Sequence, residues 1–319
     1  MGHDQRFKEF LRAFLQDFLK LFYPHVEERL DFGELEFLDT EVFTHLHDGS
    51  RREADVVAKL RTRDGQPELV LIHVEVQART EPDVNERMFE YYSLLRSRYK
   101  LPIFPIVVYL SRGKKGFEVE EYRDSLFGTE ILLFRYESIR LARLSAEEYL
   151  DTGGPVAAGL AALMNRSARS RRRTLEALRL SMLWEVVESA LDEARQFLLF
   201  DLIETYFPLT DKQRARYQRL VSRKENWKMQ EVELSWAEKL EQKGLEKGRE
   251  QGREEGREQG REEGLLAGKR ETLTRLMTAK FGALPDAETA DIEAIESLGE
   301  LDALLERVLT ATSRDEMKL

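Results

Sequence analysis

Residues 53–77 read EADVVAKLRTRDGQPELVLIHVEVQ, and this stretch decides the predicted fold. Residues 51–61 and 69–77 have the apolar content and alternation of β-strands, and the Asp-Gly pair between them is a hairpin signal. Side chains alternate along a strand, so Glu75 and Gln77 share one face of the second strand. We therefore predict a hairpin whose second strand ends in two polar side chains on the same face.

Asp55 is the candidate for a second acid on the neighbouring strand. A carboxylate on an apolar strand is costly to bury alone, and a divalent cation is one suitable partner. A loop of two residues, 64–65, pairs Asp55 with Val74 and turns it away from Glu75. A loop of three residues, 64–66, or a bulge puts both acids on one face. The metal site requires the second geometry; two surface acids at strand ends are the alternative.

The flanking segments give an α/β class with the order α-β-β-β-α-β. Helical spacing of apolar residues predicts a helix over residues 6–23, ended by Pro24. Residues 35–47 are β-rich and predict the first strand. A second helix is expected from about 82 to 99, and residues 103–110 are typical of a short buried strand.

The second half of the chain is predicted to be helical. Residues 141–239 contain no clear strand, and a low-complexity tract at 243–268 has glycine at every fourth position. Glycine weakens a helix, whereas Glu and Arg three residues apart favour one, so a long charged helix and a solvated linker both remain open. The predicted divisions are 1–150 for the α/β domain, 151–240 for a helical extension, 241–268 for the spacer and 269–319 for a small helical domain.

Composition restricts the classes of function. The chain has 319 residues, no cysteine and a formal net charge of −10, which exclude disulfides and thiolate sites and are not typical of a DNA-coating protein. The first 15 residues lack the apolar core of a signal peptide. The longest strongly apolar stretch, 103–110, is far shorter than the roughly 20 residues of a membrane helix. A soluble cytoplasmic protein without membrane contact is expected.

Six stretches in this order and spacing resemble one known family. They are DQRFKEFL at 4–11, EFLDTEVF at 36–43, EADVVAKL at 53–60, LIHVEVQ at 71–77, RMFEYYSLL at 87–95 and LPIFPIVVYL at 101–110. Together they resemble the Rpn family of recombination-promoting nucleases, also described as putative transposases, within the PD-(D/E)XK superfamily. The resemblance implies a restriction-endonuclease-like core and hydrolysis of DNA phosphodiesters, linked to recombination or mobile elements.

The resemblance also implies roles for individual residues. Asp55 and Glu75 would bind a divalent cation, with Mg²⁺ expected and Mn²⁺ or Ca²⁺ as alternatives. Gln77 takes the position where the superfamily usually has lysine, so it puts the catalytic rate in doubt more than metal binding. An acid from the first helix often joins the site, and Glu9 is the first candidate and Asp4 the second. A catalytically weak or inactive binding protein of the same fold is the alternative function.

DNA is the expected partner, and basic side chains are the candidate contacts. They are Lys59, Arg166, Arg169, Arg171, Arg172 and Arg173. A solvated helix face is an equally good interpretation of the arginine cluster. His45 and His47 are expected on a solvent-facing strand, and His73 in the core or beside the metal ligands. The region 243–319 is a candidate surface for homo-oligomer formation.

Overall fold

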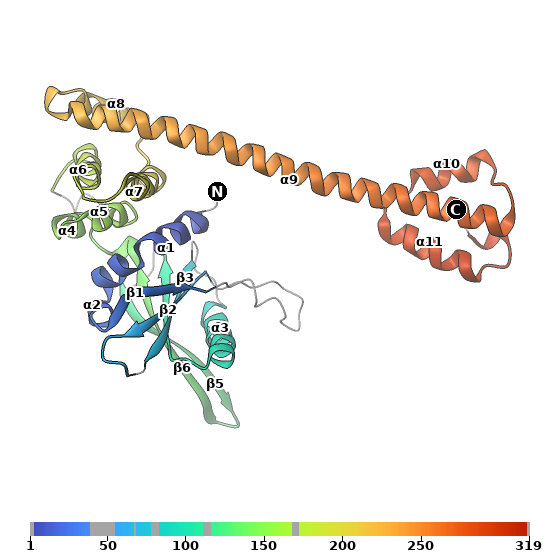
Figure 1. Ribbon diagram of the computed structural model, residues 1–319, viewed down its shortest axis with the longest axis horizontal. Coiled ribbons are helices and arrows are strands. Elements are labelled where there is room, and N and C mark those ends of the chain that lie inside the picture. Colours follow the sequence, from blue (N-terminus) through green and yellow to red (C-terminus); the bar gives the residue numbers. More distant parts are fainter. Residues whose placement is uncertain are drawn as a thin grey trace. The chain divides into compact units, whose positions relative to one another are not determined.

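The computed structural model is an α/β fold with a six-stranded mixed sheet and many helices (Figure 1). The structure describes residues 3–38, 55–66, 68–77, 83–110, 116–167 and 172–317. The chain forms two compact units, residues 1–237 and 238–319.

The strands of the sheet lie in the order β1-β2-β3-β4-β6-β5. Their bounds are β1 Leu30–Phe37, β2 Val56–Thr62, β3 Leu69–Gln77, β4 Ile103–Tyr109, β5 Phe117–Leu126 and β6 Thr129–Arg140. The pairs β3–β4 and β4–β6 are parallel, and the other neighbours are antiparallel. Strands β3 and β4 are central and consist mainly of buried residues, as expected for strands covered on both faces.

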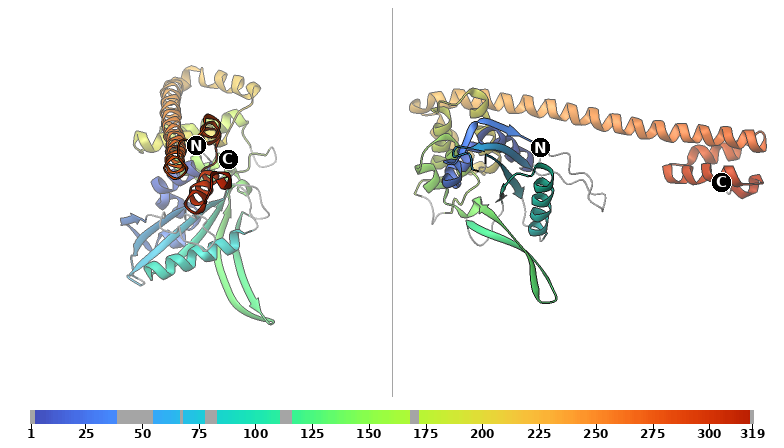
Figure 2. Two further views of the ribbon diagram at one scale, coloured as in Figure 1. Left: turned by 90° about the vertical axis from the view of Figure 1, so that its right-hand side faces the viewer. Right: turned by 60° about the horizontal axis from the view of Figure 1, so that its bottom comes forward.

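Helices α1 (His3–Phe22) and α3 (Val84–Tyr99) lie on opposite sides of the sheet (Figure 2). The short helix α2 (Pro24–Glu27) follows α1. The inner stripe of α1 consists of buried phenylalanine and leucine side chains, with Phe7 and Phe10 among them. The inner stripe of α3 packs into a cluster with β3 and β4. The predicted helices and the two strands at 69–77 and 103–110 therefore form where the periodicity of the sequence indicates.

The first strand begins earlier in the structure than the predicted range of 35–47, which it overlaps at residues 35–37. Strand β1 begins at Leu30, whose partner across the ladder is Thr62, and the described strand ends at Phe37. A register shift between Asp31 and Glu36 interrupts the alternation on which the sequence argument relied. Residues 39–54, with His45, His47 and the start of the second predicted strand, lie outside the described residues.

The predicted core order was also incomplete, because β5 and β6 form a long antiparallel hairpin that extends the sheet (Figure 1). Its turn is Phe127-Gly128, with φ of 52° and 79°. Two consecutive positive φ values are the geometry of a tight hairpin turn, for which Asn-Gly is the usual sequence. Phenylalanine at the first position hides this signal in the sequence, and its side chain is 97% exposed.

A helical extension continues the first unit. Its helices are α4 (Ala146–Asp151), α5 (Pro155–Ala161), α6 (Leu175–Val187), α7 (Glu193–Tyr206) and α8 (Asp211–Val221), with short 3₁₀ turns at Leu141–Arg143 and Lys224–Asn226. Four of them begin at capping residues whose side chains accept a backbone N–H, namely Ser145, Thr174, Asp192 and Thr210. Arg6 of α1 pairs with the buried Asp201 of α7 at 3.3 Å, which joins the extension to the α/β part.

The glycine-rich tract is helical, since α9 runs from Trp227 to Phe281 without a break. Its last turns pack with α10 (Asp286–Ala294) and α11 (Leu298–Thr310) around a core that includes Leu273 and Leu304. A final 3₁₀ turn spans Arg314–Met317. Within the described residues, no helix has both the length and the apolar character that crossing a bilayer requires.

Candidate functional site

The register of β2 and β3 places Asp55 opposite Glu75. The ladder pairs Val56 with Val74, so the next step toward the end of β3 brings these two acids together. At the other end, the Thr62 N–H donates to the Glu68 carbonyl at 3.1 Å, which leaves an odd number of residues in the loop. This is the geometry that the metal site requires, and the two acids share one face of the sheet.

The two carboxylates close the end of the ladder by reciprocal bonds to the backbone. The Asp55 N–H donates to Glu75 Oε2 at 3.3 Å, and the Val76 N–H donates to Asp55 Oδ2 at 2.7 Å. Gln77 donates from Nε2 to Glu75 Oε1 at 3.2 Å. Asp55, Glu75 and Gln77 are 9%, 4% and 7% exposed. The structure therefore brings the three candidate residues from two strands into one buried polar group.

Two basic side chains from different helices flank this pair. Lys8 Nζ of α1 lies 2.5 Å from Asp55 Oδ1, and Arg87 Nε of α3 lies 4.0 Å from Glu75 Oε1. The first helix thus brings a cation to the site. The acid predicted from the same helix, Glu9, follows Lys8 in the sequence and is half-buried, and its role stays a prediction. The side chain of the second candidate, Asp4, lies outside the described part of the chain.

His73 is fully buried beside Glu75. Its Nε2 lies 3.6 Å from Glu75 Oε2, and its ring meets Tyr91 edge-on at 5.6 Å between centroids. Neither ring nitrogen has a hydrogen-bond partner within the described structure. A buried ring nitrogen without a hydrogen-bond partner is costly, so His73 is a polar group that the fold keeps beside Glu75 at an energetic cost.

Burial perturbs the ionisation of Asp55. Burial and the neighbouring Glu75 together raise the pKa of Asp55 to about 7, although the contact with Lys8 lowers it. The pair is thus short of positive charge even with Lys8 in contact. A divalent cation would supply that charge.

Asp55 and Glu75 fit such an ion as a minimal ligand set. No group of three or more His, Cys, Asp or Glu that could hold a metal occurs among the residues the structure describes. Mg²⁺ is commonly held by one or two protein carboxylates, with water and substrate phosphate completing its shell. The pair matches that pattern and does not match a closed site made only of protein ligands.

A second polar group continues across the same face of the sheet. In register, Gln77 lies beside Tyr109 of β4, and Tyr109 lies beside Arg140 of β6. The Arg140 guanidinium lies 4.2 Å from the Tyr109 ring centroid and donates from Nη2 to Glu120 at 2.6 Å. Tyr109 and Tyr136 also donate to Glu120. This group was not predicted from the sequence, because Glu120, Tyr136 and Arg140 belong to the β5–β6 hairpin, whose turn has no usual hairpin sequence.

The basic residues proposed for DNA contact lie mostly beside acids. Lys59 Nζ is 2.9 Å from Glu36 of β1. Arg172 and Arg173 both pair with Asp151, and their backbone N–H groups donate to Glu147. These partners neutralise much of the local positive charge. Arg169 and Arg171 lie outside the described residues.

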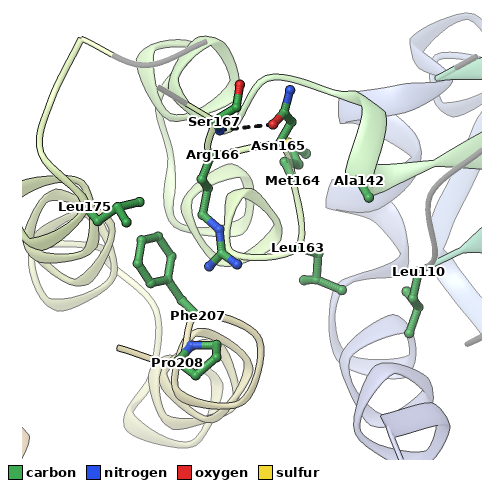
Figure 3. Close-up of a pocket in the computed structure, with 10 residues that line it drawn as sticks. All are labelled: Leu110, Ala142, Leu163, Met164, Asn165, Arg166, Ser167, Leu175, Phe207 and Pro208. Atoms are coloured by element: carbon green, nitrogen blue, oxygen red, sulfur yellow. Dashed lines mark hydrogen bonds between the residues drawn. The ribbon is translucent and has the colours of Figure 1, made fainter. Parts of the chain in front are cut away.

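Arg166 lines a cavity of about 470 Å³ in the helical extension (Figure 3). Its Nη1 donates to the Tyr206 carbonyl at 3.1 Å, and its guanidinium lies 4.1 Å from the Phe207 ring centroid. Burial lowers its pKa. The cation therefore completes the C-terminal end of α7, where carbonyl groups lack helical partners. Asn165 and Ser167 also line the cavity, and the Ser167 N–H donates to Asn165 Oδ1 at 3.0 Å (Figure 3).

No protein-family model, curated protein or solved structure matches this chain. A proposal of function therefore rests on the geometry around Asp55 and Glu75 and on the resemblance of the six sequence stretches.

Proposed function

We propose that this chain is a metal-dependent DNA endonuclease of the PD-(D/E)XK type, related to the Rpn nucleases. The observation that carries the proposal is the pairing of two buried acids, Asp55 and Glu75, across one hairpin at the end of an apolar strand. The sheet with α1 and α3 on its two sides is compatible with a restriction-endonuclease-like core. Linkage to recombination or mobile elements follows from the sequence resemblance.

The residues of the site would divide the work as follows. Asp55 and Glu75 would hold the cation, with Mg²⁺ expected and Mn²⁺ or Ca²⁺ as alternatives. A cation held there would supply positive charge beside the scissile phosphate and a more acidic water. Gln77 fixes Glu75 through its Nε2, and its amide oxygen is the group that can order the attacking water. The Val76 N–H holds Asp55 so that its carboxylate keeps one orientation.

A plasmid-cleavage assay tests the proposal. We expect wild-type protein to nick or linearise supercoiled DNA with Mg²⁺ or Mn²⁺, and Asp55→Asn and Glu75→Gln to lose that activity at least ~100-fold. Glu36→Gln is the matched control, because Glu36 is an exposed acid on the neighbouring strand that pairs with Lys59. Equal cleavage by wild type and by both site variants would refute the proposed site.

A non-catalytic binding protein is the second candidate. The observation in its favour is that Lys8, Gln77 and two backbone N–H groups give both carboxylates partners without a metal. In this case DNA or a protein partner binds without turnover, and the region 243–319 serves oligomer formation. DNA binding that survives in Asp55→Asn, with no cleavage by wild type under any of the three metals, would favour this function.

A further inference from the structure

Lys8 connects the candidate site to helix α1 through an ion pair with Asp55. Its ammonium lies 2.5 Å from Asp55 Oδ1, closer than any other cation to this pair of acids among the described residues. Its side chain is 27% exposed, whereas the side chain of Asp55 is 7% exposed. The charge therefore lies at the boundary between solvent and the buried carboxylate, where an incoming phosphate would arrive.

The helix that carries Lys8 is held firmly. Phe7 and Phe10 are buried on either side of it in the sequence, with their rings 5.3 Å apart between centroids. Two residues earlier, Arg6 pairs with the buried Asp201 of α7 on a different side of the helix. A side chain on such an anchored element meets its target in one geometry, which a catalytic group requires.

Arg87 is the other basic side chain at the site, and it suits a different role. Its side chain is 13% exposed, lies 4.0 Å from Glu75, and also pairs with Asp83 one helical turn earlier at 3.5 Å. Its charge is shared between Asp83, directly before its own helix, and Glu75 of β3. Lys8 is more exposed and closer to its acid, so it is the cation that a substrate can reach.

We propose that Lys8 is a catalytic residue that contacts the scissile phosphate and stabilises the negative charge formed on it. This role rests on the proposed nuclease function. In the reaction a water oxygen bonds to phosphorus while the bond from phosphorus to the leaving oxygen breaks. The water releases a proton to solvent and the leaving oxygen takes one up. Lys8 keeps its own protons throughout, since an ammonium has three N–H donors and can hold a carboxylate and a phosphate oxygen together.

Lys8→Met tests this role in the full-length chain. We expect its single-turnover cleavage of a DNA duplex to fall roughly 100-fold, the usual effect of removing one charge-stabilising donor. With a hydrolysis-resistant phosphorothioate duplex, the slope of log affinity against log salt should fall by about one, as for a lost phosphate contact. Lys20→Met is the control, because Lys20 is an exposed lysine of the same helix and should change neither quantity.

Moving the positive charge from position 8 of α1 to position 77 of β3 distinguishes a catalytic role of Lys8 from a structural one. Gln77 Nε2 lies 3.2 Å from Glu75 Oε1, so Gln77→Lys would bring an ammonium to the same pair of acids. We expect the double variant Lys8→Met/Gln77→Lys to recover at least tenfold in rate over Lys8→Met. Tryptophan fluorescence confirms that each variant is folded.

Three results would overturn the role of Lys8, and only the third of them also rejects the nuclease proposal. Cleavage and salt dependence equal to wild type in Lys8→Met would remove Lys8 from the site, while loss of activity in Asp55→Asn would leave the nuclease standing. Cleavage that falls in Lys8→Met with no recovery in the double variant, and with an unchanged salt slope, would show a structural ion pair. Equal cleavage by wild type and Asp55→Asn would reject the nuclease and Lys8 together.

Discussion

Replacing Asp55 by asparagine should change how the stability of the metal-free protein depends on pH. Burial, reinforced by Glu75, raises the pKa of Asp55 from a usual value near 3.8 to about 7. Between these pH values the native protein keeps a proton that the unfolded chain has lost. The free energy of unfolding of wild type therefore falls as the pH rises through this window. An asparagine side chain has no titrating proton, so the free energy of unfolding of Asp55→Asn should not show this fall with rising pH.

The structure sets the size of the effect. Asp55 is 9% exposed, so solvent screens its charge only slightly. A pKa raised from near 3.8 to about 7 corresponds to at most roughly 4 kcal/mol, at about 1.4 kcal/mol per pH unit. As the pH rises from about 4.5 to 8, we expect the free energy of unfolding of Asp55→Asn to increase by several kcal/mol relative to that of wild type. The bond from the Val76 N–H is kept, because the asparagine side-chain oxygen also accepts.

Urea unfolding at several pH values, followed by tryptophan fluorescence, measures the difference. All three tryptophans of the chain, Trp184, Trp227 and Trp236, belong to the unit of residues 1–237, so the signal reports on the unit that contains the site. Asp64→Asn is the control. The hydrogen bond from the Gln66 N–H is the main cause that lowers the pKa of Asp64. Asp64 therefore titrates below about pH 4.5, and the stability difference between Asp64→Asn and wild type should stay constant from about pH 4.5 to pH 8.

Divalent metal provides a second arm of the same measurement. An ion that binds only the native state at 100 times its Kd adds about 2.7 kcal/mol to the free energy of unfolding. Mg²⁺ or Mn²⁺ should therefore stabilise wild type at pH 8 and have little effect on Asp55→Asn. Parallel pH curves for wild type and Asp55→Asn would refute the burial argument, and equal stabilisation of both by metal would refute the ligand assignment.

Three further substitutions test packing, each by circular dichroism or urea unfolding. Gly159→Ala should lower the free energy of unfolding by about 1–3 kcal/mol, because the new Cβ would lie 2.8 Å from Cδ2 of the buried Leu199; an unchanged value would contradict the packing of α5 on α7. Gly256→Ala in α9 should raise the free energy of unfolding by up to about 1 kcal/mol, because the added Cβ would meet no atom within 4 Å. A lower free energy of unfolding would indicate that a second chain packs against the glycines of α9. Leu273→Ala should cost about 2–5 kcal/mol in the C-terminal unit and leave the tryptophan transition of residues 1–237 unchanged; a shift of that transition would show that the units unfold together.

The sequence by itself determined those features that depend on neighbours within a few residues. The period of 3.6 in α1 and the continuous apolar run of β4 set their secondary structure and buried faces. Alternation along β3 put Glu75 and Gln77 on one face before any contact was known. The same reasoning left helix and linker open for residues 243–268, because glycine and the charged pairs have opposing local effects.

Tertiary structure decided which distant residues meet at the site. The sequence of the loop between β2 and β3 is compatible with an even or an odd number of loop residues. The packing of both strands in the sheet selects the register that places Asp55 opposite Glu75. Lys8 reaches Asp55 across 47 positions of sequence, which no local pattern encodes. The β5–β6 hairpin turns through Phe127, a residue that avoids positive φ unless the surrounding ladder holds it there. The energy of long-range packing determines the strand register, the ion pair between Lys8 and Asp55, and the turn at Phe127. The sequence therefore predicted the two acids but not the lysine that contacts one of them.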